Sequence, residues 1–116
     1  MTVSARAGAC PLDWLCKAGD MVLEVALIDV QAGQEEAFAK AYAQARPIVA
    51  GTAGCLSVRM TQGIESPSRF VLLIEWESVE AHNQNFRETE RFAEWRGLIG
   101  PHFAHPPLVE HFTDLG

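Results

Sequence analysis

Residues 70–77, FVLLIEWE, restrict the fold more than any other stretch, because they predict a β-strand that is apolar on both faces. Successive side chains of a strand point to opposite faces of the sheet. One face would carry Phe70, Leu72, Ile74 and Trp76, and the other Val71, Leu73 and Glu75. A sheet with one wetted face would instead alternate apolar and polar residues. Both faces of this sheet are therefore expected to be covered.

The predicted elements follow one another in an order that indicates a fold. Gly33, the turn at 51–54 and the Pro-rich stretch at 100–107 separate segments with strand or helix periodicity, and a kink or restart is expected near Thr89. The predicted strands are 21–30, 55–63, 70–77 and 108–115, and the predicted helices are 34–49 and 79–99. This β-α-β-β-α-β order predicts an α+β, ferredoxin-like antiparallel sheet with both helices on one face.

The chain is long enough for one domain with a core, but its two helices can cover only one face of the sheet. Residues 1–20 lack a clear period and are expected to form an N-terminal extension, with the domain at 21–116. Each large side chain left in water costs about 1.5–3 kcal/mol relative to burial, and an apolar patch of this kind usually marks an interface. We therefore expect a homodimer with two sheets packed face to face. The alternative is that the extension folds back as a lid.

The second predicted helix has a broad aromatic side. Val79, His82 and Phe86 are three and four residues apart and project from that side. The stripe continues with Phe92, Trp95, Arg96 and Ile99. Apolar walls with a few convergent polar groups are typical of small-molecule pockets. The alternatives are that the aromatic residues belong only to the core and that His82 bonds a backbone carbonyl.

Charge and composition argue against several classes of function. The formal net charge of −6 leaves no basic stripe for nucleic acid, and no apolar run approaches the ~20 residues that span a membrane. The N-terminus lacks the continuous apolar segment of a secretory signal. Three cysteines without paired spacing favour a reduced cytoplasmic protein, although Cys10 and Cys16 would close a small loop in an oxidising compartment.

A histidine-containing stretch near the C-terminus raises the question of a metal site. It contains His102, His105, Glu110 and His111. Zinc needs three or four converging ligands, and a Pro-bounded loop followed by a strand gives no reason for these side chains to converge. We expect no metal site and interpret the histidines as surface or interface residues.

Three segments and the element order together resemble the antibiotic biosynthesis monooxygenase family over about residues 21–115. The segments are LIEWES at 73–78, VEAHNQNFRETERFAEWR at 79–96 and GPHFAHPPLVEHF at 100–112. The resemblance implies a dimeric α/β barrel that oxidises polycyclic phenols to quinones with molecular oxygen. It also implies that no flavin, metal or haem takes part, so no cofactor is expected. Haem degradation, known from other members, is disfavoured because the first strand has no asparagine.

The resemblance also implies roles for individual residues. His82 is the expected proton acceptor, and Arg96 or Arg59 would hold the resulting anion. The expected walls of the substrate site are Trp76, Phe86, Phe92 and Trp95. Two functions follow: a cytoplasmic monooxygenase of a phenol or hydroquinol, or a non-catalytic, stress-related small-molecule-binding protein with the same dimeric barrel. An open cavity touching His82 would favour the enzyme, and a closed interior would favour the second function.

Overall fold

The computed structural model describes residues 21–116, which form one sheet with helices on one side. The strands are β1 (Val22–Asp29), β2 (Cys55–Gln62), β3 (Arg69–Trp76) and β4 (Leu108–Phe112). The helices are α1 (Glu35–Ala50), α2 (Val79–His82) and α3 (Glu90–Ile99), with a π-helical turn η2 (Asn83–Arg87) before α3 and a 3-10 turn η3 (Gly100–His102) after it. The α+β, ferredoxin-like fold predicted from the sequence is confirmed.

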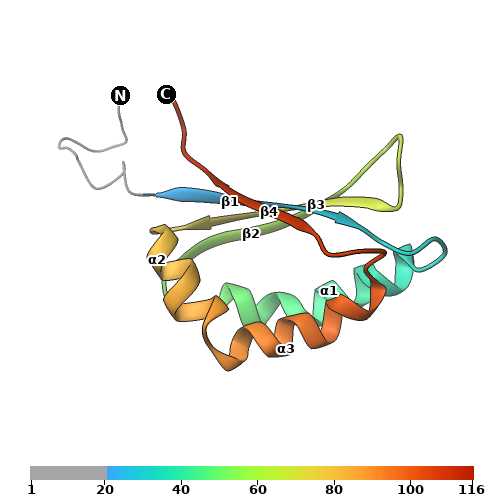
Figure 1. The fold of residues 1–116 in the computed structure, drawn as a ribbon, viewed down its shortest axis with the longest axis horizontal. Helices are drawn as coiled ribbons and strands as arrows, with labels where there is room; N and C mark the ends of the chain where they lie inside the picture. The colour runs from blue at the N-terminus through green and yellow to red at the C-terminus, as the bar shows by residue number, and fades with distance from the viewer. Residues whose placement is uncertain (1–20) are drawn as a thin grey trace.

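The sheet has the strand order β2-β3-β1-β4, and every neighbouring pair is antiparallel. Figure 1 shows α1 and α3 beneath one face of the sheet, with no helix of residues 21–116 over the other. The helix-facing side carries Phe70, Leu72, Ile74 and Trp76, all buried as the alternation in β3 predicts. Phe38 and Val49 of α1 are fully buried against this side. The core therefore lies between the sheet and its two long helices.

The helical segment at 79–99 is interrupted, as expected, near Thr89. The side chain of Ser78 caps α2 by accepting a hydrogen bond from the Ala81 N–H (3.0 Å). The five residues of η2 then widen the helix into a π-turn before the Thr89 side chain accepts a hydrogen bond from the Arg91 N–H (3.2 Å) and α3 begins. Such π-turns occur frequently at functional sites.

The face of the sheet opposite the helices carries a group of apolar side chains beside charged ones such as Glu75 and Glu110. Leu27 lies opposite Leu108 of β4, and Leu23 lies opposite Phe112. Leu27 is 43% exposed, Phe112 48% and Leu108 58%. We call this set, Leu23, Val25, Leu27, Val71, Leu73, Leu108 and Phe112, the outer face of the sheet. The possible lid and the Cys10–Cys16 loop lie in residues 1–20, outside the described residues.

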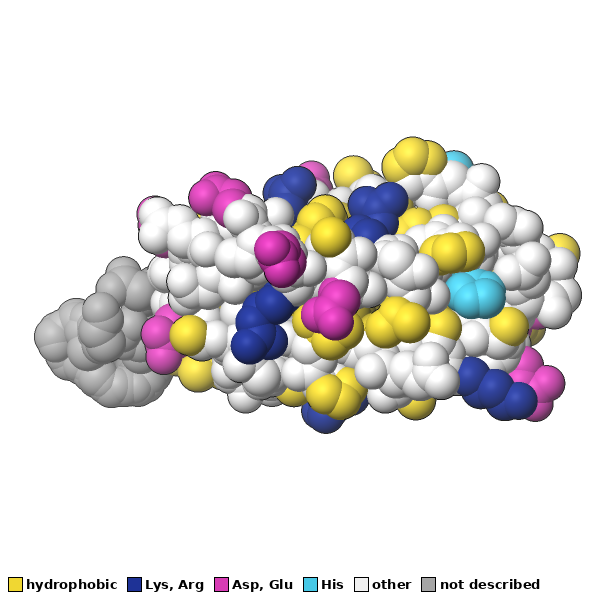
Figure 2. Space-filling model, turned by 90° about the horizontal axis from the view of Figure 1, so that it is seen from below, with side chains coloured by type: hydrophobic (Ala, Val, Ile, Leu, Met, Phe, Trp, Pro, Cys, Tyr) yellow, Lys and Arg dark blue, Asp and Glu magenta, His cyan; other side chains and the backbone are white. Residues whose placement is uncertain are grey.

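The opposite side of the molecule, covered by α1 and α3, is chemically mixed. Figure 2 shows Lys and Arg side chains standing apart among acidic and apolar ones on this side. The described residues thus form no continuous basic stripe on this face of the kind that contacts phosphates. In residues 21–116, moreover, every helix falls short of the length and apolar character needed to cross a bilayer.

Candidate functional site

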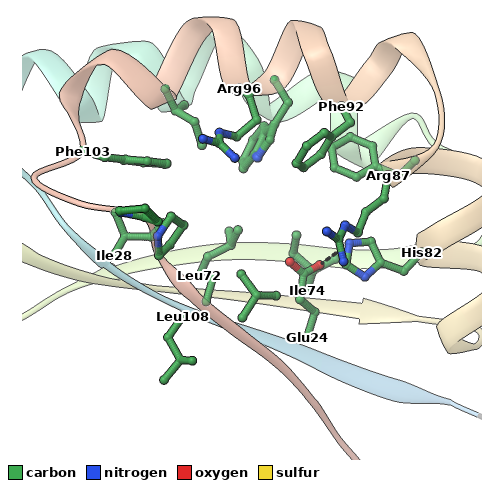
Figure 3. Close-up of a pocket in the computed structure, with 17 residues that line it drawn as sticks. Glu24, Ile28, Leu72, Ile74, His82, Arg87, Phe92, Arg96, Phe103 and Leu108 are labelled. Atoms are coloured by element: carbon green, nitrogen blue, oxygen red, sulfur yellow. Dashed lines mark ion pairs between the residues drawn. The ribbon is translucent and has the colours of Figure 1, made fainter.

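A cavity of about 420 Å³ lies between the helix-facing side of the sheet and α3 (Figure 3). Its sheet side is formed by Ala26, Ile28, Leu72 and Ile74, and its helix side by Phe86, Phe92, Trp95 and Ile99. Trp95 stands edge-on to Tyr42 of α1 and to Phe86, with ring centres 6.3 and 6.2 Å away, so the aromatic wall is held from behind. A cavity of this size and composition suits a small apolar or aromatic molecule.

Two arginines stand at the edge of this cavity. Arg87 of η2 and Arg96 of α3 both line it, and both are exposed. Each guanidinium carbon lies 5.8 Å from the centre of the Phe92 ring, so cation–π contacts hold the two charges near the entrance. The ion pairs found within residues 21–116 include neither of them. Both charges are therefore available to an anionic ligand.

The polar end of the cavity is a buried cluster around Glu24 and His82. Trp76 Nε1 donates a hydrogen bond to Glu24 Oε1 (2.9 Å), and His82 Nε2 lies 3.3 Å from the same oxygen (Figure 3). His82 Nδ1 is 2.8 Å from Nε2 of His111 on β4, and the His82 ring stacks on Trp76 with ring centres 4.8 Å apart. Glu24 and His82 are 6% and 2% exposed. Burial of two ionisable groups beside an open cavity is characteristic of acid–base sites.

The surroundings shift the pKa values of this cluster. Burial raises the pKa of Glu24, against smaller lowering effects of the Trp76 hydrogen bond and the charge of Arg87. Burial, followed by the neighbouring His111 and Arg87, lowers the pKa of His82 to about 4. The pKa of His111 is lowered by burial and by Arg87. His82 is therefore neutral near pH 7 and able to donate one hydrogen bond and accept another.

The local sequence explains how α2 brings His82 to this place. Gly54 has φ +92°, and a Cβ there would lie 2.7 Å from the Cβ of Ala81, so only glycine lets α2 sit this close to the start of β2. The Glu77 N–H donates to the Gly54 carbonyl (2.8 Å), and the Asn85 side chain donates to the Ala53 carbonyl (2.8 Å). The capped helix and the π-turn are thus fixed on both sides of His82.

The cavity gathers most of the residues singled out in the sequence. His82, Phe86, Phe92, Trp95 and Arg96 all line it. The two ring nitrogens of His82 face the side chains of Glu24 and His111, and not the backbone carbonyl considered as the alternative partner.

Two of the expected site residues lie outside the cavity lining. Trp76 is fully buried behind Glu24 and His82, so it holds the acid–base pair and forms no wall. The expectation that Arg59 holds an anion in this cavity is corrected by the structure. Arg59 of β2 pairs with Leu73 of β3, and both side chains belong to the side of the sheet away from the cavity. Strand alternation puts Val58, its buried neighbour, on the helix side in its place.

Three residues of this site, Glu24, Arg87 and His111, were not assigned to it from the sequence. Glu24 shares the inward positions of β1 with Ala26 and Ile28, and a carboxylate in that apolar series was the available signal. Arg87 reaches the cavity through the π-turn, which helix periodicity does not reveal. His111 had been weighed as a metal ligand and interpreted as a surface or interface residue.

The histidines near the C-terminus do not converge. His102 Nδ1 lies 2.8 Å from Gln34 Oε1, His105 Nε2 lies 3.0 Å from Asp29 Oδ2, and His111 contacts His82. Within residues 21–116, moreover, no group of three or more His, Cys, Asp or Glu side chains is arranged to hold a metal ion.

The lowered pKa of His82 predicts a loss of stability on the acid side of neutrality. The unfolded chain, where histidine has a pKa near 6.5, binds more protons than the folded one between about pH 6.5 and 4. The contribution of His82 is therefore full above pH 6.5 and is lost as the pH falls toward 4, by roughly 2 kcal/mol between pH 7 and 5. His111 acts in the same direction, and Glu24, whose pKa is raised, acts in the opposite one.

Urea unfolding of the wild type and of His82→Gln at pH 7 and pH 5 measures this contribution. The free energy of unfolding should fall more steeply on acidification for the wild type than for the variant. Parallel pH profiles for the two proteins would show that His82 is not held in its neutral form.

Comparison with known proteins places the chain in a family. The family model for antibiotic biosynthesis monooxygenases matches residues 21–98. The Bacillus subtilis protein YczJ is 35% identical over 95 residues, which are 82% of this chain and all of YczJ. A crystal structure of a Bordetella bronchiseptica protein named for the same family is 41% identical, with a TM-score of 0.80 over 84% of this chain and 99% of that one.

A further solved structure, at low sequence identity, shares the fold of this chain. SnoaB, a cofactor-independent oxygenase from Streptomyces nogalater, has a TM-score of 0.73 at 15% identity, over 84% of this chain and 95% of its own. The resemblance noted in the sequence is confirmed by the family model and by the two closer relatives. The chain belongs to the antibiotic biosynthesis monooxygenase family.

Proposed function

We propose that this protein is a monooxygenase that oxidises an aromatic phenol or hydroquinol with molecular oxygen and needs no added cofactor. The observation that carries the proposal is the cavity of about 420 Å³, which has apolar and aromatic walls, a buried Glu24–His82 pair at one end and two arginines at its edge. An open cavity touching His82 favours the enzyme over the binding protein as the first function to test.

The reaction begins with loss of the phenolic proton to the acid–base pair. The phenolate is then held by Arg87 and Arg96 beside apolar walls that exclude water, where a positive charge stabilises an anion more strongly than in bulk water. The electron-rich ring carbon reacts with O₂. One oxygen atom replaces the hydrogen at that carbon and becomes the quinone oxygen, and the other leaves as water. A phenol and one O₂ thus give a quinone and one water, so no external reductant is needed.

The same proposal includes a homodimer formed through the outer face of the sheet. The exposed Leu27, Leu108 and Phe112 share this face with half-buried aliphatic residues. Leu108 is among the residues that line the cavity, but Figure 3 shows its side chain beneath the strands. A second copy that covers this face would remove several large apolar side chains from water, and it would leave the cavity on the helix side of each sheet. The proposal also includes a reducing, cytoplasmic setting, which the unpaired spacing of the three cysteines favours.

The proposal is tested by oxygen uptake with phenols and hydroquinols of one to three rings, without added cofactor and with a metal chelator present. At least one substrate should be oxidised faster than in buffer by orders of magnitude, since enzymes typically accelerate reactions by about 10⁶-fold or more. With a simple phenol and ¹⁸O₂, the quinone should carry one labelled oxygen atom.

Oxidation of hydroquinols alone, to quinones without label and together with hydrogen peroxide, would identify a dehydrogenation and contradict the monooxygenase. Tight binding of a phenol without any oxygen uptake would favour the small-molecule-binding protein instead.

A further inference from the structure

We propose that Glu24, and not His82, is the residue that takes the proton from the substrate, and that His82 and His111 are positioning residues. This inference rests on the proposed function only in assuming a ligand with an acidic hydroxyl group. It replaces the assignment suggested by the sequence, in which His82 was the proton acceptor.

The two ring nitrogens of His82 each face a polar partner. Nε2 lies 3.3 Å from Glu24 Oε1, and Nδ1 lies 2.8 Å from His111 Nε2. A neutral imidazole has one N–H and one lone pair. When Nε2–H points to the Glu24 carboxylate, Nδ1 must accept the hydrogen bond that His111 Nε2–H donates. His82 then has no lone pair left for a proton from the cavity.

Glu24, in contrast, has one carboxylate oxygen, Oε2, that makes neither of these contacts. Within residues 21–116, its polar contacts with Trp76 and His82 both go to Oε1. Figure 3 shows the carboxylate at the cavity wall, with its other oxygen on the side away from His82. The carboxylate is thus oriented by two neighbours through one oxygen, and its second oxygen, Oε2, is the acceptor that a bound hydroxyl group meets.

Charged and titratable groups from several elements lie around Glu24. They are His82 of α2, Arg87 of η2, His111 of β4 and the half-buried Cys55 of β2. Burial keeps the pKa of this carboxyl above its ordinary value, which brings it nearer to that of a phenol and makes it a better proton acceptor. Arg87, which acts on the same carboxylate, is placed to hold the negative charge once it has moved to the substrate.

The proton transfer is balanced within the site. The O–H bond of the substrate breaks, and its electron pair stays on the substrate oxygen. A new O–H bond forms on Glu24 Oε2. The single negative charge therefore passes from Glu24 to the substrate, which remains beside Arg87, and no other reactant is required.

The experiment uses 4-nitrophenol as a probe, because its neutral and ionised forms absorb at different wavelengths. Bound to the wild type, the probe should become the phenolate. Glu24→Gln, which keeps the size of the side chain and an acceptor for Trp76 but cannot take up a proton, should bind the probe within about threefold of the wild-type affinity. Below the pKa of the free probe, each probe molecule that ionises on this variant should release its proton to the buffer, whereas the wild type should keep that proton on Glu24. Oxygen uptake by this variant should fall by about 10²–10⁴-fold, the range expected for loss of a general base.

His82→Phe separates positioning from proton acceptance. A phenyl ring can still stack on Trp76, but it places no N–H beside Glu24, so the carboxylate becomes more basic. The pH midpoint of probe ionisation should move downward, because a more basic carboxylate takes the proton of the bound probe at lower pH, and the fully ionised state should still be reached. Glu94→Gln, the same substitution at an exposed position of α3 outside the cavity lining, should behave as the wild type.

Ionisation of the probe by Glu24→Gln without release of a proton to the buffer would overturn the inference. So would a neutral probe on the wild type, or complete loss of ionisation in His82→Phe alone. Glu24-dependent ionisation without any oxygen uptake would leave Glu24 as the proton acceptor and would contradict only the proposed oxidation.

Discussion

Leu27→Glu is expected to convert the proposed homodimer into monomers at micromolar concentrations. Leu27 is 43% exposed on the outer face, opposite Leu108 and Val71 of the neighbouring strands. Burying a leucine stabilises by about 1.5–3 kcal/mol, and a two-fold interface buries it twice. Loss of both contributions should raise the dissociation constant by about 10²–10⁴-fold. Light scattering across a dilution series measures the change.

The control adds the same charge on the other side of the molecule. Ala93→Glu lies at an exposed position of α3 and should leave the dimer unchanged. Far-ultraviolet circular dichroism should show that both variants keep the wild-type secondary structure. A wild-type protein that is monomeric at all concentrations would contradict the homodimer directly.

Val109→Trp is expected to block the cavity and to reduce kcat/KM by about 100-fold or more. Val109 lies in β4 opposite Ala26, lines the cavity and is 40% exposed, so an indole can be placed there from the solvent side without entering the core. Even small displacements of a bound substrate can cost about 10²-fold in rate. The effect is read from oxygen uptake with the best substrate of the panel.

Ala93→Trp, which adds the same side chain at the exposed position of α3, should keep wild-type activity. Val109→Trp should also bind 4-nitrophenol more weakly, while its unfolding midpoint in urea stays close to that of the wild type. Wild-type turnover in Val109→Trp would place the reaction elsewhere in the molecule.

The fold could be predicted from the sequence because its elements carry strong periodic signals. The alternation of Phe70, Leu72, Ile74 and Trp76 fixes which side of β3 faces the helices. The restart near Thr89 was also visible, because a threonine before an acidic residue is a typical helix cap. The π-turn between His82 and Thr89 was not, since five residues are too few to show a different period.

The candidate site was only partly predictable, because its polar cluster depends on strand pairing. His82 meets His111 because β1 pairs with β4 in a register that puts Glu24 opposite His111. No local pattern reports that register. Arg59 was misplaced for a related reason: its face on β2 follows from its pairing with Leu73 of β3.

A crystal structure of the protein with 1-naphthol, grown without oxygen, tests the central claim most directly. We predict that the naphthol rings lie between the sheet and α3, with the hydroxyl group within hydrogen-bond distance of Glu24 Oε2. A cavity closed by its own side chains, or naphthol bound only outside it, would contradict the proposed site.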